Sequence, residues 1–276
     1  MWITSAILWI SLEGDWKMKN LQDELALALT EKLSKLFGPK ANRNITVDLK
    51  NDKSLVTEID IFVSNLIKKK LFNHLSYSHY VFFSEEDFKE YTFPCAILDP
   101  IDGTRELVAG RPECVVSLAL MKVPDIDHPD NYAWLYNPFS GFSLDSSTPF
   151  VASLDKSVQK FLTFVSRTEY HKDYYKKYLN HPQIEITPRG SIAFKLGLLA
   201  SGASDFIVSL EPKNVWDIAA GTILCAQRGI YFYENGKRIT ILERQKYGGV
   251  LIWAPPSIAP LVLKIFENEF KNEKNQ

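Results

Sequence analysis

The stretch Cys95-Ala-Ile-Leu-Asp-Pro-Ile-Asp-Gly-Thr104 decides the fold of this 276-residue chain. Its first four residues are apolar and indicate a buried strand, which runs directly into Asp99 and Asp102. Pro100 excludes a regular helix between the two aspartates and favours an extended conformation at Asp99. Gly103 allows the backbone to turn sharply. We therefore predict a turn that directs two carboxylates toward one point.

Such a turn suits a hard divalent cation. The carboxylates of Asp99 and Asp102 and the carbonyl of Ile101 are oxygen ligands of the kind that Mg²⁺ prefers. Thr104 is placed to cap the short helix that follows, so the amides of Gly103 and Thr104 would form an anion site. Adjacent metal and phosphate sites indicate phosphoryl chemistry. The alternative is an Asp-Pro turn with Asp102 as a surface acid.

Other apolar segments also carry acids at their ends. An apolar strand over 80–83 leads into Glu85-Glu86-Asp87, whose carboxylates repel one another unless a cation or a solvent-facing turn separates them. Asp217 begins an apolar helix, and Asp60 stands at the start of another. A solvated loop is the alternative for the first group, and an ordinary helix N-cap is the alternative for Asp217 and Asp60.

Together these segments resemble the signature of the inositol monophosphatase superfamily of Mg²⁺-dependent, lithium-sensitive phosphatases. The chain carries Ser84-Glu-Glu86, Asp99-Pro-Ile-Asp-Gly-Thr104 and Trp216-Asp-Ile-Ala-Ala-Gly221 in the family's order. The likeness extends from about Leu21 to the end of the sequence. It implies an α+β fold built as a layered α-β-α-β-α sandwich, which agrees with the mixed order of the expected strands and helices.

The resemblance also implies roles for individual residues. Two or three Mg²⁺ ions would be held by four carboxylates and one carbonyl, those of Glu85, Asp99, Asp102, Asp217 and Ile101. Glu85 and Thr104 would position the attacking water, and Asp60 would hydrogen-bond Thr104 or serve a third metal. The amides of Gly103 and Thr104 would hold phosphate oxygens. Lys50 matches a lysine that the family places near the site.

The residues after Thr104 bear on the substrate. Asp-Gly-Thr followed by Arg105 and Glu resembles the 3'(2'),5'-bisphosphate nucleotidases of the CysQ type. The segment 187–193 resembles the family's substrate loop, and Arg189 and Lys213 are candidates to pair with a second phosphate or, alternatively, plain surface cations. The implied substrate contacts are Gly103, Thr104, Arg189, Gly190, Ser191, Lys213 and Asp217, with the Gly190 amide and Ser191 facing the leaving group and Lys50 and Arg105 as accessory residues.

Three functional hypotheses follow. The leading one is a Mg²⁺-dependent phosphomonoesterase that removes the 3'-phosphate of adenosine 3',5'-bisphosphate with a metal-activated water. The alternative enzyme is an inositol monophosphatase or related sugar-phosphate phosphatase, which is weakened because Glu211 is displaced by one residue from the family's inositol-binding glutamate. The alternative of another class is a non-catalytic metal- or phosphate-binding regulator on the same fold.

Composition excludes several other classes of protein. Lys and Arg number 32 and Asp and Glu number 33, a balance that argues against binding a nucleic-acid polymer. The three cysteines lie far apart in apolar runs, which excludes a disulfide scaffold and fits a reducing compartment. We therefore expect a cytoplasmic enzyme for a small phosphate monoester, as a monomer or a homodimer.

The chain divides into three parts by composition. Residues 1–19 are expected to be an N-terminal extension outside the fold. Its apolar run at 2–12 is too short to cross a membrane, although it leaves open a peripheral association with the inner membrane. A polar break at 146–149 separates an N-terminal half, 20–148, with most metal ligands from a C-terminal half, 149–276, with the substrate loop and Asp217. Helices are expected over 25–37, 59–71, 169–179, 192–200 (capped by Ser191), 217–226 and from 257, and strands over 95–98, 115–123, 132–136, 141–144, 161–165, 205–210, 230–233 and 238–242.

Overall fold

The structure is a computed structural model that describes residues 19–33, 47–49, 55–73, 77–87, 90–150 and 160–270. A helix over 19–33 begins at the last residue of the expected extension, and the remainder of that extension lies outside the described residues. Lys50 also lies outside them. In the described part of the chain, no helix combines the length and the apolar character needed to span a membrane.

The first sheet contains the acid-bearing strands. Its five strands are β3 (Val81–Ser84), β4 (Cys95–Asp102), β5 (Val115–Met121), β6 (Tyr132–Tyr136) and β7 (Ser143–Asp145), which lie in that order. The β3–β4 pair is parallel and the remaining pairs are antiparallel. Because β3 and β4 run in the same direction, the acids that follow β3 and the two aspartates at the end of β4 lie at the same edge of the sheet.

Alternating side chains of this sheet face two different helical layers. In β4, Ala96 and Leu98 pack with the helix over 19–33 and with α2 (Glu58–Phe72), whereas Cys95 and Ile97 face the opposite side. The period of two continues in β5, where Leu118 packs with the outer helices and Ala119 faces inward. Both faces of the sheet are therefore buried, which explains the continuous apolar runs in its central strands.

The second sheet comes from the C-terminal half. Its strand order is β13-β12-β15-β10-β8-β9. The strands β8 (Phe161–Ser166), β9 (Ile184–Arg189) and β10 (Phe206–Ser209) are parallel, and β12 (Tyr231–Glu234), β13 (Lys237–Ile239) and β15 (Leu251–Ala254) pair antiparallel. The remaining strands form two small antiparallel pairs, β1 (Val47–Leu49) with β2 (Leu55–Thr57) and β11 (Lys213–Asn214) with β14 (Lys246–Tyr247).

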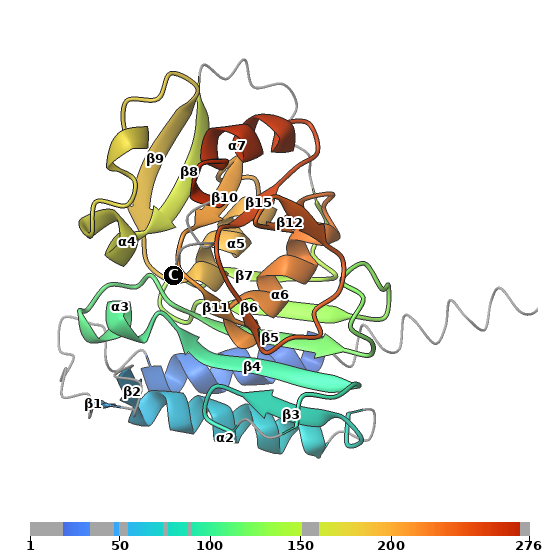
Figure 1. Cartoon of the computed structure of the whole chain (residues 1–276). Coiled ribbons are helices and arrows are strands. Elements are labelled where there is room, and N and C mark those ends of the chain that lie inside the picture. Colours follow the sequence, from blue (N-terminus) through green and yellow to red (C-terminus); the bar gives the residue numbers. More distant parts are fainter. Residues whose placement is uncertain are drawn as a thin grey trace, which may run out of the picture.

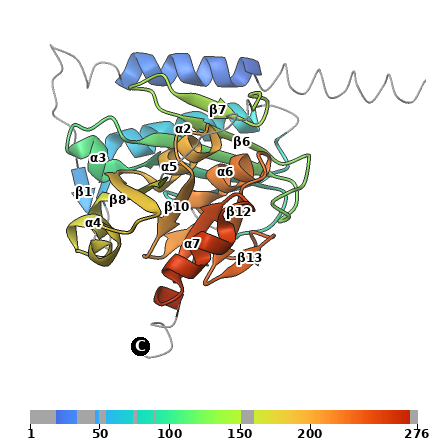
Figure 2. The same ribbon diagram turned by 90° about the horizontal axis from the view of Figure 1, so that it is seen from above.

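Two helices lie between the sheets, and a third lies outside the second sheet. The helices α5 (Ile192–Ala200) and α6 (Val215–Ala226) occupy the middle layer, and α7 (Ala259–Phe266) covers the outer face, as Figures 1 and 2 show. Strands of both sheets pack against α5 and α6 in one continuous core. The molecule is therefore an α-β-α-β-α sandwich, as predicted, and its two halves share the middle core.

The helix expected over 169–179 is not continuous. The structure has a short helix α4 (Arg167–His171) and a 3₁₀ turn η2 (Lys176–Tyr178), and Asp173 between them has a left-handed φ of 61°. The break brings the hydroxyl of Tyr175 to within 2.5 Å of the Glu169 carboxylate. Residues six positions apart point to different sides of a regular helix, so this contact requires the chain to turn.

Strand β4 continues further than expected, through Pro100 to Asp102. Its pairing with β5 shifts register between Asp99 and Asp102, which marks a β-bulge. A bulge leaves a residue out of the ladder and can accommodate a proline, which has no N–H to donate. The bulge therefore turns the strand at the two aspartates.

Candidate active site

One cavity of about 280 Å³ lies where the edge of the first sheet meets the starts of α5 and α6. It brings together most residues that the sequence singles out, although they come from distant parts of the chain. The predicted site residues that line it are Glu85, Asp99, Ile101, Asp102, Gly103, Thr104, Arg105, Arg189, Gly190, Ser191, Lys213 and Asp217.

Asp99 is the most deeply buried of the acids that line the cavity. Its side chain is 2% exposed, and its Oδ1 has no hydrogen-bond partner. Burial raises the pKa of Asp99 well above its usual range, and repulsion from Glu85, Asp102 and Asp217 raises it further. An unpartnered buried carboxylate among other carboxylates is costly unless a cation neutralises it.

Asp102 has a structural role that the sequence analysis did not foresee. Its Oδ2 accepts hydrogen bonds from the Ser191 hydroxyl at 2.6 Å and from the backbone N–H of Ala193 at 2.5 Å. Ser191 in turn accepts from the N–H of Phe194 at 2.9 Å, as the predicted cap of α5. Burial raises the pKa of Asp102, and these hydrogen bonds act in the opposite direction. Asp102 therefore ties the bulge of β4 to the start of α5.

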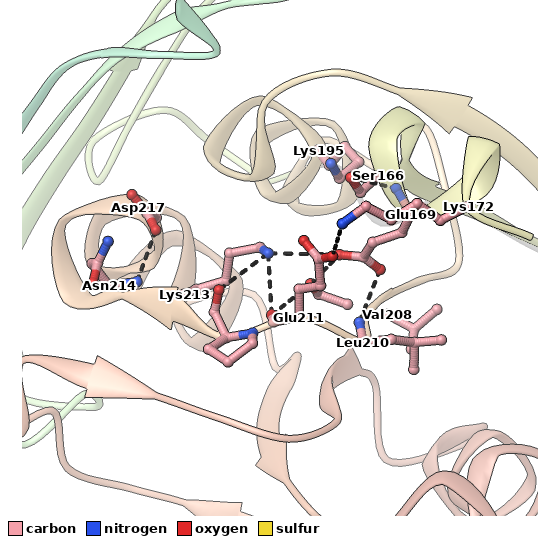
Figure 3. Close-up of polar contacts among 12 residues, drawn as sticks. Ser166, Glu169, Lys172, Lys195, Val208, Leu210, Glu211, Lys213, Asn214 and Asp217 are labelled. Atoms are coloured by element: carbon pink, nitrogen blue, oxygen red, sulfur yellow. Dashed lines mark hydrogen bonds and ion pairs between the residues drawn. The ribbon is translucent and has the colours of Figure 1, made fainter. Parts of the chain in front are cut away.

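Asp217 lies in the first turn of α6. Its Oδ2 accepts from the N–H of Asn214 at 2.8 Å, within a capping box (Figure 3). Burial and then repulsion from Asp102 raise the pKa of Asp217 to about 8. The alternative that Asp217 is the N-cap is wrong, because Asn214 is the N-cap and Asp217 is the third residue of α6. One carboxylate oxygen completes the capping box, and the carboxylate lines the acidic cavity.

The donor set fits a hard divalent cation. In the part of the chain that the structure describes, no three Asp, Glu, His or Cys side chains are grouped closely enough to form a ready-made metal site. However, the lining acids raise one another's pKa, and Asp99 Oδ1 is an orphaned oxygen in their midst. These are oxygen ligands whose mutual repulsion a cation would relieve, so binding requires only that side chains converge further.

The Thr104 hydroxyl contacts Asp60, the acid that the family resemblance pairs with it. The hydroxyl lies 3.2 Å from Asp60 Oδ1 and 3.0 Å from the carbonyl oxygen of Ile101. The other oxygen of Asp60 accepts from the N–H and the hydroxyl of Thr57 at 2.8 and 2.6 Å, in the capping box of α2. This is the expected hydrogen bond between Asp60 and Thr104, and it lies just behind the cavity wall.

The expectation that Thr104 caps the next helix is wrong. Thr104 is the first residue of α3 (Thr104–Val108), and the N-cap is Gly103, which has a left-handed φ of 98°. A Cβ at Gly103 would lie 2.9 Å from the carbonyl oxygen of Glu113. Only glycine combines this conformation with so close an approach. The Thr104 hydroxyl is therefore available to Asp60 and Ile101 instead.

The substrate loop differs from the expectation at two groups, the Gly190 amide and the Ser191 hydroxyl. The Gly190 amide does not face a leaving group, because it donates to Glu113 Oε2 at 2.8 Å. Arg189 lies 3.4 Å from the other oxygen of Glu113 and over the ring of Phe164. The Ser191 hydroxyl is likewise engaged with Asp102. The loop is thus bonded to Glu113 and Asp102, and Arg189 still lines the cavity.

Several lining residues were missed by the sequence analysis. Lys195 is 3% exposed, and burial lowers its pKa to about 8. It is the one charged residue in the apolar segment 192–200, which was an available signal. Glu106 and Arg167 also line the cavity, and Arg167 pairs with Glu113 at 2.5 Å. No local pattern marks Arg167, because its ion pairs with Glu106 and Glu113 join segments more than 50 positions apart.

Comparison with known proteins identifies the family. Residues 17–269 match the model of the inositol monophosphatase family. The chain is 26% identical over 222 residues to the 3'(2'),5'-bisphosphate nucleotidase CysQ of Haemophilus influenzae, covering 74% of this chain and 81% of that protein. It is 26% identical over 247 residues to inositol monophosphatase 3 of Solanum lycopersicum, covering 80% and 89%.

A solved structure supports the same assignment at the level of the fold. The IMPase of Thermotoga maritima superimposes with a TM-score of 0.74 at 21% identity, covering 93% of this chain and 99% of that one. This confirms the layered sandwich predicted from the sequence. The family match spans nearly the whole chain. The protein therefore belongs to the inositol monophosphatase family, whose members are phosphatases that act on phosphate monoesters.

Proposed function

We propose that this protein is a Mg²⁺-dependent phosphomonoesterase that hydrolyses the 3'-phosphate of adenosine 3',5'-bisphosphate. The observation that carries the proposal is a single cavity lined by both acids for a metal and cations for a second phosphate. The CysQ nucleotidases of Haemophilus influenzae and Aggregatibacter actinomycetemcomitans support the substrate class. A related IMPase/NADP phosphatase whose structure contains Mg²⁺ and phosphate supports the metal.

The metal ligands in this proposal are the acids of the cavity. Two or three Mg²⁺ ions would be held by Glu85, Asp99, Asp102, Asp217 and the carbonyl of Ile101. When bound, Mg²⁺ supplies neutralisation of the phosphate charge and a more acidic water. Asp102 and Asp217 each use only Oδ2 in the hydrogen bonds that fix helices α5 and α6. These hydrogen bonds leave the Oδ1 atom of each carboxylate out of the helix contacts, and the side chains must still converge to hold a metal.

The chain itself orients the attacking water through Thr104. The Asp60 carboxylate is fixed by Thr57, and it accepts from the Thr104 hydroxyl. A hydroxyl whose proton is directed to Asp60 presents its oxygen lone pairs to the cavity, where they can accept a hydrogen bond from the water. The amides of Gly103 and Thr104 would hold phosphate oxygens. We propose direct attack by water, without a phospho-enzyme.

The cations of the cavity would recognise the second phosphate. Arg189 and Lys213 line the same cavity as the acids, and Arg105 lies at its exposed rim. A substrate with a phosphate at each end gains from fixed cations at a distance from the metal. A monophosphate of a neutral sugar would leave these cations without an anionic partner from the substrate.

One observation favours the second candidate, a phosphatase for inositol phosphate or another sugar phosphate. Glu211 lines the cavity, so its displacement by one position in the sequence does not remove it from the site. Its carboxylate is paired with Lys172 at 2.7 Å, which competes with binding of a sugar hydroxyl. We therefore place this candidate second.

The test is release of inorganic phosphate with Mg²⁺ from four compounds. They are adenosine 3',5'-bisphosphate, adenosine 5'-monophosphate, inositol 1-phosphate and fructose 1,6-bisphosphate. We expect the highest kcat/KM with the first and little release from the second, which lacks the 3'-phosphate. A higher kcat/KM with inositol 1-phosphate or fructose 1,6-bisphosphate would establish the second candidate. Release from none of them would favour the non-catalytic regulator.

A further inference from the structure

A buried carboxylate close to the cavity has no part in the mechanism described above. Glu169 in α4 is 0% exposed. Its Oε2 accepts from the Tyr175 hydroxyl at 2.5 Å and from the N–H of Leu210 at 2.9 Å, and its Oε1 accepts from the Ser209 hydroxyl at 2.9 Å. Figure 3 shows this carboxylate between α4 and the segment that leads from β10 toward α6. A charge so deeply buried requires a cationic partner.

Lys213 supplies that partner. Its Nζ lies 3.6 Å from Glu169 Oε1, and its side chain is 15% exposed. The ammonium donates to the carbonyl oxygens of Glu211 and Pro212 at 3.1 and 3.3 Å (Figure 3). These two bonds use two of its three protons. The distance to Glu169 exceeds a normal hydrogen bond, so the third N–H can donate to an anion in the cavity without loss of an existing hydrogen bond.

The position of Lys213 affects the whole site. Lys213 lines the cavity, and it precedes Asp217 by four residues at the start of α6. Burial raises the pKa of both Asp102 and Asp217, and the positive charge of Lys213 offsets part of that rise in each. A lysine that acts on two carboxylates of the cavity is within electrostatic range of a bound phosphate ester.

We propose that Glu169 is a positioning residue, which holds the Lys213 ammonium where it meets the second anionic group of the substrate. This inference rests on the proposed function, because it assigns the specificity for a doubly phosphorylated nucleotide to this ion pair. The hydrogen bonds to Ser209 and Leu210 fix the carboxylate against the segment that carries Lys213. The ion pair then fixes the end of the lysine side chain itself.

The two oxygens of Glu169 have separate partners, which permits a clean test. In Glu169→Gln, the amide oxygen can still accept from Tyr175 and Leu210, and the amide nitrogen can donate to the Ser209 hydroxyl. The amide N–H groups would then face the Lys213 ammonium and repel it. Tyr175→Phe is the matched control, because it removes a hydrogen bond from Oε2 and leaves the charge beside Lys213 unchanged.

The substrates are adenosine 3',5'-bisphosphate and adenosine 3'-monophosphate, which differ only in the 5'-phosphate. We expect Lys213→Met to lower the ratio of kcat/KM for the bisphosphate to kcat/KM for the monophosphate about tenfold, because a hydrogen bond to a charged group is lost. Glu169→Gln should lower this ratio at least about threefold, mainly through KM for the bisphosphate. In the Lys213→Met background, Glu169→Gln should have no further effect on the ratio. Tyr175→Phe should lower thermal stability and leave the ratio unchanged.

The outcomes separate this inference from the proposed function. If the wild-type protein hydrolyses neither nucleotide, the proposed function fails and the inference fails with it. If the wild type prefers the bisphosphate but Glu169→Gln keeps or increases that preference, the inference alone is overturned. Equal effects of Glu169→Gln in the presence and absence of Lys213, or an equal loss in Tyr175→Phe, would reduce Glu169 to a structural residue and would also overturn it.

Discussion

At the scale of single residues, Asp99 and Asp102 are alike in the sequence but different in the structure. Asp99 has an oxygen without a partner, whereas Asp102 Oδ2 accepts two hydrogen bonds at the start of α5. Asp99 is buried among other carboxylates, whereas Asp102 is half-buried and is acted on by the positive charges of Lys195 and Lys213. Loss of either carboxylate should therefore abolish metal-dependent catalysis, but the two losses should affect stability in opposite directions.

We predict that Asp99→Asn and Asp102→Asn both lower kcat at least about 100-fold, as expected when charge stabilisation of the transition state is removed. In EDTA, Asp99→Asn should keep or raise the free energy of unfolding, because it removes a buried, repelled charge. Asp102→Asn should lower it by about 1 kcal/mol, the usual cost of a weakened helix cap. Urea unfolding measures both values, and equal destabilisation by the two variants would contradict the distinction.

A second prediction concerns pH and Asp217. The pKa of its carboxyl is raised to about 8 in the folded protein from an ordinary value of 3.8. Folding therefore favours the protonated form, and the metal-free protein should lose stability as pH rises from about 4 to about 8. Unfolding in EDTA should show this decline between pH 5 and pH 8, and Asp217→Asn should make it shallower.

Added Mg²⁺ should reverse the decline, because a ligand that binds only the folded state stabilises it. The gain in melting temperature should be larger at pH 8 than at pH 5, where protons compete for the carboxylates. A metal-free stability that is constant or increases over this range would show that burial and repulsion from Asp102 do not raise the pKa of Asp217 in the folded protein.

At the scale of elements, the middle layer depends on a close approach of α5 and α6. A Cβ at Gly221 in α6 would lie 2.5 Å from the Cβ of Leu196 in α5, which is far inside van der Waals contact. We predict that Gly221→Ala destabilises the protein by about 1–3 kcal/mol, the usual cost of overpacking. Gly248→Ala is the control, because nothing lies within 4 Å of its added Cβ. Similar melting temperatures for the two variants would contradict this packing.

Sequence periodicity predicts correctly those helices and strands whose apolar pattern reflects which of their side chains are buried. The strand at Cys95, the cap at Ser191 and the strands on either side of Asn235-Gly236 follow from adjacent residues, and the structure contains all of them. The break near Asp173 does not follow in this way. It is set by contacts of Glu169 with Ser209 and of Tyr175 with Val208, both in β10 and more than 30 positions away.

The same distinction holds for the candidate site. Acids that follow buried strands or begin helices were recognisable, because apolar runs rarely end in several carboxylates without a reason. The cap that Asp102 provides to α5 and the bond from Gly190 to Glu113 join residues more than 75 positions apart. Pairings of this kind arise only when the chain is folded, so the sequence expectation for the Gly190 amide was wrong.

At the scale of the whole molecule, the two halves are joined through the middle layer. Inward side chains of the first sheet, such as Ile97 and Leu135, share one core with α5, α6 and the second sheet. We predict a single cooperative transition in calorimetry of the intact chain. Separate fragments 20–148 and 149–276 should not fold alone, because each would expose half of this core. Two separate transitions, or a folded fragment, would show that the halves are independent domains.

The central claim is that one cavity gathers carboxylates from distant segments to bind Mg²⁺ for hydrolysis of a phosphate ester. Its most direct test is phosphate release from adenosine 3',5'-bisphosphate as a function of Mg²⁺ concentration, for the wild type and Asp99→Asn. We predict release by the wild type that rises from near zero and saturates with Mg²⁺, and no saturable release by Asp99→Asn. Release that is independent of Mg²⁺, or an Asp99→Asn enzyme with a wild-type Mg²⁺ response, would contradict the claim.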